Sequence, residues 1–512
     1  MRGGLLAMLG AVMVVTAPVA AAPQDALGAL RVRLADMDRA LQEDPSVQTL
    51  PVSALMGRFG LDALPGQLQP DVLGAAPMPR HRHSAPDQPA TAEIADFRIV
   101  LALLSQSYSN EDNTDVIRAQ GVRGPVALAF RGGVVTPQVI RDALAQFEPG
   151  VPMEQGPGRV TLRRPILLWE DTVLRLGPQD DIALSRPDGA FILSLGAVEV
   201  EGSSLTVAGG PNAYSSEFVP FLTIGGGGSL RMTDATVTDL GFGWTDKFSG
   251  VSLVGHPFMP SDGISAVKDS HFENIVTLVM AGARDAQVSG NRFQDVRDNA
   301  LRLIQSPRVR VERNVFFGVG RTNAIRLLDR SSEAVIAGNV LLRGERAGIL
   351  VRDGSSYTTV SGNLLWARDG GAIKFDRVEC GVASQNLVID GRQKGIEVRR
   401  SPGTALRRNL IAGNNSTGIW ISEQPSGALT QIESNVIARN GAGIATATAG
   451  HIELIGNDLS GQLPRLVQGD IIPQNRALIA DLRGERPLIL SAGGAAPVGE
   501  RLAGHCETEA RP

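Results

Sequence analysis

The sequence predicts an all-β protein, a right-handed parallel β-helix with a small mixed α/β region at its N-terminus. The first observation is a short apolar strand that ends in Asn and recurs between Asn291 and Asn457 at intervals of 23, 25, 24, 23, 23, 26 and 22 residues. The second is another strand between these repeats, in which two small residues precede an apolar-x-apolar triplet, as in 299–303 and 323–327. Alternating apolar and polar residues are typical of a half-buried strand, and regular repeats of this length predict coils that stack into a solenoid.

The repeated Asn residues are expected to have a structural role. Asn tolerates the left-handed backbone conformation at a sharp corner, and its amide can bond to the Asn of the next coil. The 59 glycines and the low aromatic content (4%) fit tight turns around a core of small and branched aliphatic side chains.

The chain divides into five expected segments. Arg2, an apolar run too short to span a bilayer and the small residues before Ala22 predict a signal peptide, which makes the protein secreted and periplasmic. A short N-terminal anchor helix is the alternative, and no later stretch is apolar enough to span a membrane. The segments are a signal peptide (1–21), a helix and Pro-rich linker (22–90), a small mixed region that caps the first coil (91–160), the β-helix (161–465) and a C-terminal cap and tail (466–512).

Charge indicates the kind of ligand. The net charge is −4, which argues against a nucleic-acid partner, yet residues 300–409 hold 19 Lys and Arg against 10 Asp and Glu, an excess of nine. A basic segment in an acidic exported protein favours an acidic ligand. No spacing suggests a metal ion or a cofactor. Cys380 and Cys506 could form a bridge in an oxidising compartment or remain unpaired.

Outward positions of the second strand should form columns along the solenoid axis. The first column is Arg302, Arg326, Leu350, Lys374, Glu397 and Trp420, and the second is Ile304, Leu328, Arg352, Asp376, Arg399 and Ser422. Acidic residues interleave with the basic ones, so the face is either a solvated, salt-bridged surface or a groove for carboxylates, which Arg binds bidentately. The candidate substrate-binding residues are Arg302, Arg326, Arg352, Arg377, Arg399 and Trp420.

Four collinear segments, 218–228, 240–242, 247–252 and 269–275, together with the Asn-ended coils, resemble the periplasmic mannuronan C5-epimerases of alginate export systems. The resemblance covers about residues 162–461. It implies a β-helix that acts on an anionic, uronic-acid polysaccharide, with export proteins as further partners.

The family's Asp-Pro-His-Asp motif is not matched. Repeat alignment places it on residues 302–305 or 326–329, and neither segment contains His. Asp329 matches the final Asp, Arg330 follows it as in the family, and Asp376 with Arg377 resembles another family pair.

Abstraction of the C5 proton requires a base and a cation that neutralises the carboxylate. The candidate catalytic residues are Lys374, Arg330, Asp329 and Asp376, with Tyr357 or His271 as other possible bases. The sequence leans towards an enzyme, an epimerase or a β-eliminating lyase. The alternatives are a non-catalytic polysaccharide-binding component of an export apparatus and a neutral-glycan hydrolase that uses Asp353 and Asp376.

Overall fold

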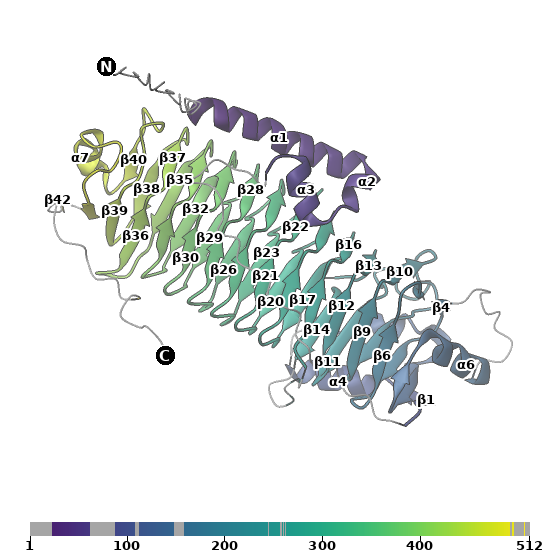
Figure 1. Cartoon of the computed structure of the whole chain (residues 1–512). Helices are drawn as coiled ribbons and strands as arrows, with labels where there is room; N and C mark the ends of the chain where they lie inside the picture. Colours follow the sequence, from purple (N-terminus) through teal and green to yellow (C-terminus); the bar gives the residue numbers. More distant parts are fainter. Residues whose placement is uncertain are drawn as a thin grey trace, which may run out of the picture.

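The computed structural model describes residues 23–61, 88–107, 112–147, 158–243, 245–255, 259, 261, 263–491, 494–495 and 506. Three long sheets run along the molecule, and successive strands pass from one sheet to the next, so that each coil adds a strand to every sheet. Figure 1 shows the coils stacked side by side in sequence order. The predicted right-handed parallel β-helix is confirmed.

Sheet A contains 15 strands, and all its pairs are parallel except β1 with β2. Its strands are β1 (Thr91–Asp96), β2 (Val126–Arg131), β5 (Ile166–Leu168), β8 (Ile192–Ser194), β11 (Leu222–Gly226), β14 (Gly250–Gly255), β17 (Thr277–Ala281), β20 (Leu301–Ile304), β23 (Ile325–Leu328), β26 (Ile349–Arg352), β29 (Ile373–Asp376), β32 (Lys394–Arg399), β35 (Thr417–Ser422), β38 (Ile444–Ala447) and β40 (Val467–Gly469).

Sheet B follows sheet A in each coil and ends with two antiparallel strands. Its strands are β3 (Val134–Val135), β6 (Val173–Leu176), β9 (Ala197–Glu201), β12 (Leu230–Thr233), β15 (Ala266–Lys268), β18 (Gln287–Ser289), β21 (Arg310–Glu312), β24 (Val335–Ala337), β27 (Thr359–Ser361), β30 (Val382–Ser384), β33 (Ala405–Arg407), β36 (Leu429–Glu433), β39 (His451–Ile455), β41 (Leu488–Ser491) and β42 (Gly494–Ala495).

Sheet C completes each coil and has 12 parallel strands. They are β4 (Arg159–Leu162), β7 (Asp181–Ser185), β10 (Ser204–Ala208), β13 (Thr236–Thr238), β16 (His271–Glu273), β19 (Arg292–Gln294), β22 (Val315–Phe317), β25 (Val340–Leu342), β28 (Leu364–Trp366), β31 (Leu387–Ile389), β34 (Leu410–Ala412) and β37 (Val436–Ala438).

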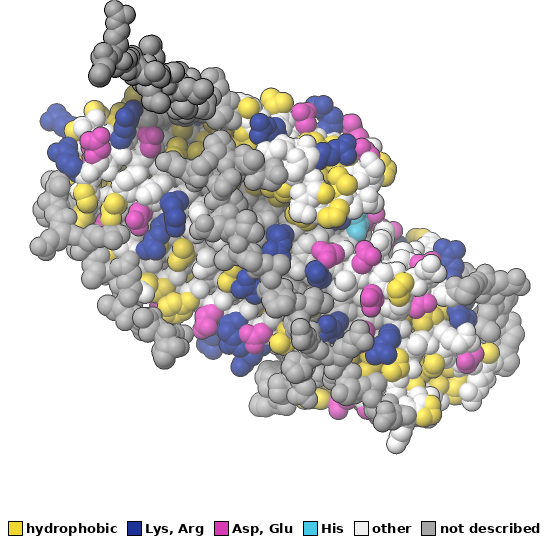
Figure 2. All heavy atoms as spheres, viewed as in Figure 1, with side chains coloured by type: hydrophobic (Ala, Val, Ile, Leu, Met, Phe, Trp, Pro, Cys, Tyr) yellow, Lys and Arg dark blue, Asp and Glu magenta, His cyan; other side chains and the backbone are white. Residues whose placement is uncertain are grey.

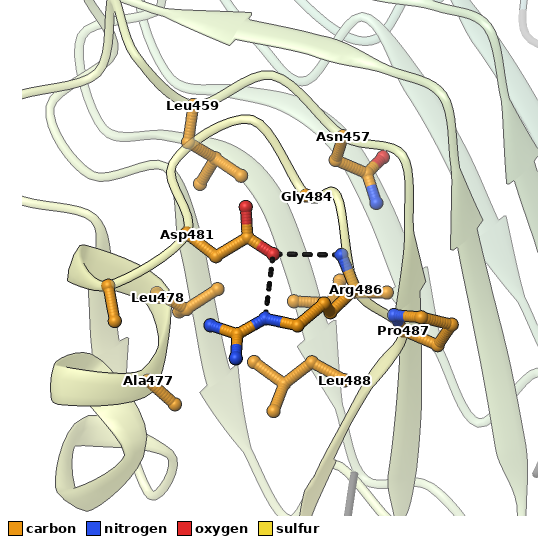
Figure 3. Close-up of a pocket in the computed structure, with 11 residues that line it drawn as sticks. Asn457, Leu459, Ala477, Leu478, Asp481, Gly484, Arg486, Pro487 and Leu488 are labelled. Atoms are coloured by element: carbon orange, nitrogen blue, oxygen red, sulfur yellow. Dashed lines mark hydrogen bonds and ion pairs between the residues drawn. The ribbon is translucent and has the colours of Figure 1, made fainter. Parts of the chain in front are cut away.

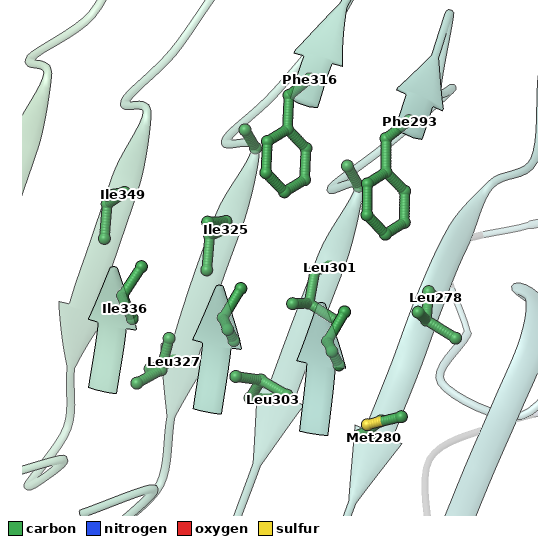
Figure 4. Packing of buried hydrophobic residues seen from close by; sticks show 14 of the residues in the cluster. Leu278, Met280, Phe293, Leu301, Leu303, Phe316, Ile325, Leu327, Ile336 and Ile349 are labelled. Atoms are coloured by element: carbon green, nitrogen blue, oxygen red, sulfur yellow. The ribbon is translucent and has the colours of Figure 1, made fainter. Parts of the chain in front are cut away.

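Inward side chains of the three sheets form the core of the solenoid. Leu301 pairs in register with Ile325, and Ile325 with Ile349, so like side chains stack from coil to coil (Figure 4). The rings of Phe293 and Phe316 stack in the same way with centroids 4.8 Å apart. Because inward apolar residues alternate with outward ones, the repeat that fills the core also fixes which side chains line the outer faces.

The repeated Asn residues form a buried ladder at the corner between sheets B and C, as predicted. Asn339 donates from Nδ2 to the Val311 carbonyl and to Asn363 Oδ1, both at 2.9 Å. The predicted left-handed conformation of these Asn residues is wrong. The residue before each Asn has the positive φ, for example Arg313 (53°) and Gly338 (63°). That turn directs the Asn side chain inward, where its amide satisfies buried backbone groups.

Helices α1 (Pro23–Glu43), α2 (Pro45–Gln48) and α3 (Val52–Arg58) cover the outer face of sheet C. In Figure 1 α1 runs along the solenoid beside β37, β28 and β22. Buried residues of the helices, such as Leu34 and Leu41, pack with outward residues of sheet C. Arg31 pairs with Asp390 at 2.5 Å, and Arg343 with Asp38 at the same distance. This face is therefore occupied by the chain itself.

Residues around helix α4 (Arg98–Ser107) cover the first strands of sheet A. The Phe97 ring meets the Phe191 ring edge-on at 5.1 Å, and buried Lys247 donates to Asn113 at 2.9 Å. Helix α5 (Thr114–Arg118), the 3₁₀ turn η2 (Gly121–Arg123) and α6 (Pro137–Phe147) complete this region. Sheets A and B already include β2 and β3, so both sheets begin before residue 161.

The C-terminal end carries the 3₁₀ turn η3 (Ile472–Gln474) and helix α7 (Asn475–Ile479). A disulfide joins Cys380, in the turn before β30, to Cys506. Of the two expectations for these cysteines, the bridge is therefore the one that the structure shows. Among the helices that the structure describes, none has the length and apolar character to cross a membrane. The expected signal peptide lies outside the described residues.

Candidate functional site

The outer face of sheet A carries the predicted columns of charged residues. Arg302 pairs in register with Arg326, and the same ladder continues through Leu350, Lys374, Glu397 and Trp420. The parallel ladder continues from Arg352 through Asp376 and Arg399 to Ser422. Strands in one sheet lie about 4.8 Å apart, so neighbouring members of a ladder can share a ligand or a counter-ion.

The beginning of this face is covered. Val279 and Ala281 point outward from β17 yet are fully buried, and Ile304 in β20 is only 7% exposed. They form a small apolar cluster against which Leu328 of β23 packs. Partly exposed outward residues begin at β23, with the half-buried Arg326 and Leu328.

Arg302 lies at this boundary and is held between two carboxylates. One guanidinium nitrogen pairs with Asp246 and the other with Asp298. The Arg302 side chain is 11% exposed and that of Asp298 is 5% exposed. Thr322 also donates to Asp298, at 3.1 Å. With both charges buried and hydrogen-bonded, Arg302 is already neutralised within the protein.

Arg326, on the next rung, differs from Arg302. It is half-buried and makes no hydrogen bond or ion pair with any residue that the structure describes. Burial lowers the pKa of its guanidinium, and the neighbouring cations Arg302 and Arg352 lower it further, against the opposing effect of Asp298 and Asp246. Arg326 is therefore a cation at the start of the accessible face that lacks a counter-ion among the described residues.

The surroundings of Arg326 are amphipathic. Leu350 follows it in the ladder and Leu328 lies two residues along the same strand, so apolar side chains adjoin the guanidinium. Asp329 and Arg330, in the turn after β23, are exposed with φ of 50° and 66°. Neither of these two side chains forms an ion pair with a residue that the structure describes. This arrangement suits an amphipathic anion better than a small, fully hydrated one.

The corner between sheets A and B is a ladder of salt bridges. Asp353 pairs with Arg352 at 2.6 Å and also with Arg377. Burial raises the pKa of Asp353, but the two arginines lower it, and the net effect is a lowered pKa. Asp376, 6% exposed, lies 3.5 Å from Arg377 and 3.3 Å from the Arg400 guanidinium. Asp353 and Asp376 are thus bound by arginines, unlike the two acids that flank the scissile bond of a hydrolase.

The same corner ends with Arg399, which pairs with Glu423 at 2.7 Å. Figure 2 shows basic and acidic side chains clustered near the lower edge of the solenoid. Exposed pairs of this kind contribute little to stability, and they leave a surface with almost balanced charge. Arg352, Arg377 and Arg399 therefore lie on the predicted face, each beside an acid.

Further along the face, Glu397 is 8% exposed and lies between two lysines. Lys374 Nζ is 3.1 Å from one of its carboxylate oxygens and Lys394 Nζ is 3.3 Å from the other. Lys394 Nζ also lies over the Trp420 ring, 4.7 Å from its centroid. The Lys374 amine that a base would use is therefore already engaged by Glu397.

The other candidate bases lie in different places. His271 is in β16 of sheet C, next to Arg292 in register, and burial together with Arg292 lowers its pKa. His451 is in β39 of sheet B. Neither of the two histidines that the structure describes therefore lies on sheet A. Tyr357 is in the turn between β26 and β27, at the corner between sheets A and B.

A cavity of about 110 Å³ lies far from these ladders, between β39 and α7 (Figure 3). Most of its lining is apolar, including Leu459, Leu478 and Leu488. Its acid, Asp481, accepts from the backbone of Glu485 and Arg486 at 2.9 Å. No ladder residue reaches this cavity, so we place the candidate site on sheet A.

Sequence reasoning identified the ladders but missed the groups that control their charge. Asp298 precedes Arg302 by four residues, so its proximity could have been inferred from the turn before β20. Asp246 is 56 residues away in the sequence, and Lys394 begins a strand one coil after Lys374, so neither position carries a local signal. Both follow from the three-dimensional arrangement alone.

Comparisons with known proteins agree with the fold. The model of the family "Right handed beta helix region" matches residues 274–459. The mannuronan C5-epimerase of Pseudomonas putida is 22% identical over 289 residues, and that of Pseudomonas aeruginosa is 25% identical over 319 residues. These matches cover 52% and 58% of this chain and 54% and 56% of the relatives, so the chain spans about half the length of the curated relatives it matches.

Among solved structures, the crystal structure of the periplasmic alginate epimerase AlgG is similar to this chain with a TM-score of 0.61 and 19% identity. The similarity covers 75% of this chain and 95% of the other. A crystal structure of a point mutant of the same epimerase gives a TM-score of 0.60 with the same identity and coverage. The solenoid and the sequence matches together show a right-handed parallel β-helix protein that resembles the periplasmic mannuronan C5-epimerases.

Proposed function

We propose that this protein acts on an anionic polysaccharide of the uronic-acid class, held along the outer face of sheet A from β23 onwards. The observation that carries the proposal is Arg326, a half-buried guanidinium without a counter-ion among the described residues. A carboxylate on a sugar would supply the missing charge, and the adjoining, partly exposed Leu328 would contact the apolar side of the ring.

The proposed chemistry is abstraction of the C5 proton, as in a C5-epimerase or a β-eliminating lyase. The relatives named mannuronan C5-epimerase support it, as does the basic character of residues 300–409. The periplasmic epimerase among the structural neighbours and the N-terminal sequence support action in the periplasm, with export proteins as further proposed partners.

In this mechanism Arg326 pairs with the uronate carboxylate, so that the charge that develops when C5 loses its proton is stabilised. Arg330, exposed on the next turn, is the second cation that can reach the carboxylate, with Asp329 beside it. Tyr357 and Lys374 are the candidate bases near the face. An epimerase returns a proton to the opposite side of C5, whereas a lyase expels the oxygen on C4 and leaves a double bond.

A second function is a non-catalytic component of an export apparatus that binds the polysaccharide. Two observations favour it: the contact between Lys374 and Glu397, and the location of both described histidines on sheets other than A. The same carboxylate-binding face would then hold the polymer without changing it.

The test is to incubate the purified protein with polymannuronate, polyguluronate and other polyuronates in deuterated water. Proton NMR reports epimerisation and deuterium incorporation at C5, and ultraviolet absorbance reports the unsaturated ends that a lyase makes. Signals that disappear in Arg326→Gln and persist in Arg310→Gln, a control on sheet B, establish C5 chemistry at this face. No exchange on any polymer, with salt-sensitive binding that requires Arg326, establishes the binding function instead.

A further inference from the structure

We propose that Trp420 is an aromatic sugar subsite at the far end of the accessible face, about four sugar units from the carboxylate subsite at Arg326. The inference rests on the proposed function, because it assumes that a polysaccharide lies along sheet A. It gives the distance between two subsites of that site and predicts which oligosaccharides are long enough to contact both.

The position of Trp420 is fixed by its neighbours. It lies in the same ladder as Arg326, after Leu350, Lys374 and Glu397. Lys394 Nζ lies over the indole ring at 4.7 Å and pairs at the same time with Glu397. A cation–π contact backed by an ion pair restrains the ring before any ligand arrives, which reduces the entropy lost on binding.

Part of Trp420 remains exposed beside its neighbours. The next residue in the ladder after Trp420 is Ala445 in β38, which is 2% exposed, and Ala447 occupies the same position in the neighbouring ladder. Trp420 itself is partly exposed. A partly exposed aromatic ring, with an alanine beside it, is suited to contact the C–H side of a pyranose.

The distance between the two subsites follows from the coil spacing. From β23 to β35 there are four coil intervals, which amounts to about 19 Å at the usual spacing of adjacent strands. A pyranose in an extended 1,4-linked chain advances by about the length of one coil. A polymer that lies along the axis with a carboxylate at Arg326 therefore brings a sugar about four units away to Trp420.

Arg326 also marks the upstream limit of the face. Val279 and Ala281 are buried on β17, two strands of sheet A before β23, and Arg302 is enclosed by Asp246 and Asp298. The ligand must therefore extend from Arg326 towards β35 rather than in the other direction. A trisaccharide at Arg326 ends before Trp420, whereas a hexasaccharide reaches it.

The experiment is calorimetric titration of wild type, Trp420→Ala and Arg326→Gln with oligomannuronates of three and six sugars. We expect Trp420→Ala to bind the hexamer about tenfold more weakly and the trimer as the wild type does. Arg326→Gln should weaken binding of both. Trp420→Phe should restore most of the affinity for the hexamer, and Tyr214→Ala, which removes an exposed aromatic ring from another part of the surface, should change neither.

Each other result has a defined meaning. If Trp420→Ala leaves the hexamer affinity unchanged, or weakens trimer and hexamer equally, while Arg326→Gln still weakens binding of both, the subsite inference is overturned and the proposed function stands. If the wild type binds neither oligomer, nor polymannuronate at low salt, the proposed function fails and the subsite with it. Thermal unfolding of each variant confirms that it is folded.

Discussion

Arg302 and Arg326 are adjacent rungs of one ladder in sheet A, but only Arg302 has carboxylate partners among the described residues. Asp246 and Asp298 enclose the first guanidinium, whereas the second is half-buried and forms no ion pair with a residue that the structure describes. Two identical side chains at equivalent positions of the repeat therefore have different roles. Arg302 stabilises the boundary of the site, and Arg326 is available to a ligand.

Replacing Arg326 by Gln should separate binding from stability. Burial and the cations Arg302 and Arg352 disfavour the charged form of Arg326 and lower its pKa, so the folded protein gains nothing from this charge. We expect the variant to unfold at the same temperature as the wild type or slightly higher, and to bind polyuronates at least tenfold more weakly. Thermal unfolding and titration with polymannuronate measure the two effects. A clear loss of stability with unchanged binding would contradict the assignment.

Asp298→Asn should have the opposite profile. It removes one carboxylate from the buried pair with Arg302, which we expect to lower the free energy of unfolding by about 3 kcal/mol. Arg302→Met combined with Asp298→Asn should cost less than the sum of the single changes, because no unpaired charge remains at Asp298. Urea unfolding of the four proteins gives the coupling energy. Additive effects would show that the two side chains do not stabilise each other.

The sequence could predict the ladders because the repeat length sets the register of a parallel solenoid. Counting from one Asn to the next was enough to align Arg302, Arg326 and Lys374 on one face. The same counting could not place Asp246, which reaches Arg302 from an irregular segment between strands. Charge balance on the face depends on such segments, so the ladder alone could not decide between a carboxylate groove and a salt-bridged surface.

The N-terminal helix illustrates a second limit of sequence reasoning. The sequence predicts a helix within residues 22–90, and α1 does lie there, but an apolar helical face does not identify its partner. The structure shows that the partner is sheet C, whose outward residues over several coils are apolar, for example Val340 and Leu364. Nothing in the strand repeat itself marks these residues as the contact surface of a helix.

His271 should make stability depend on pH in a defined direction. Burial, together with Arg292, lowers its pKa below the ordinary value of 6.5, so the unfolded chain takes up this proton more readily than the folded protein. The stabilisation that neutral His271 gives to the folded protein is present above pH 6.5 and is lost as the pH falls below it. Nearby Glu273 has a raised pKa, from burial and from Asp239 and Asp295, and acts in the opposite direction.

The measurement for His271 compares wild type with His271→Gln, since Glu273 contributes to both. We expect the free energy of unfolding to fall less in the variant than in the wild type between about pH 7 and pH 5. Urea unfolding at several pH values provides the comparison, and His451→Gln, at an exposed position on sheet B, is the matched control. Parallel curves for wild type and His271→Gln would exclude a buried neutral histidine.

The disulfide between Cys380 and Cys506 should stabilise the C-terminal half of the solenoid. It joins residues 126 positions apart, so it restricts the unfolded chain over a long loop and fastens residue 506 to the turn before β30. We expect Cys506→Ser to lower the free energy of unfolding by roughly 2–4 kcal/mol. Cys380→Ser and the double variant should lower the free energy of unfolding by the same amount, because each removes one bond.

Thermal unfolding with and without a reducing agent tests this prediction. Reduction should lower the midpoint of the wild type and leave that of the variants unchanged. Equal midpoints for oxidised and reduced wild type would show that the bond constrains only the tail.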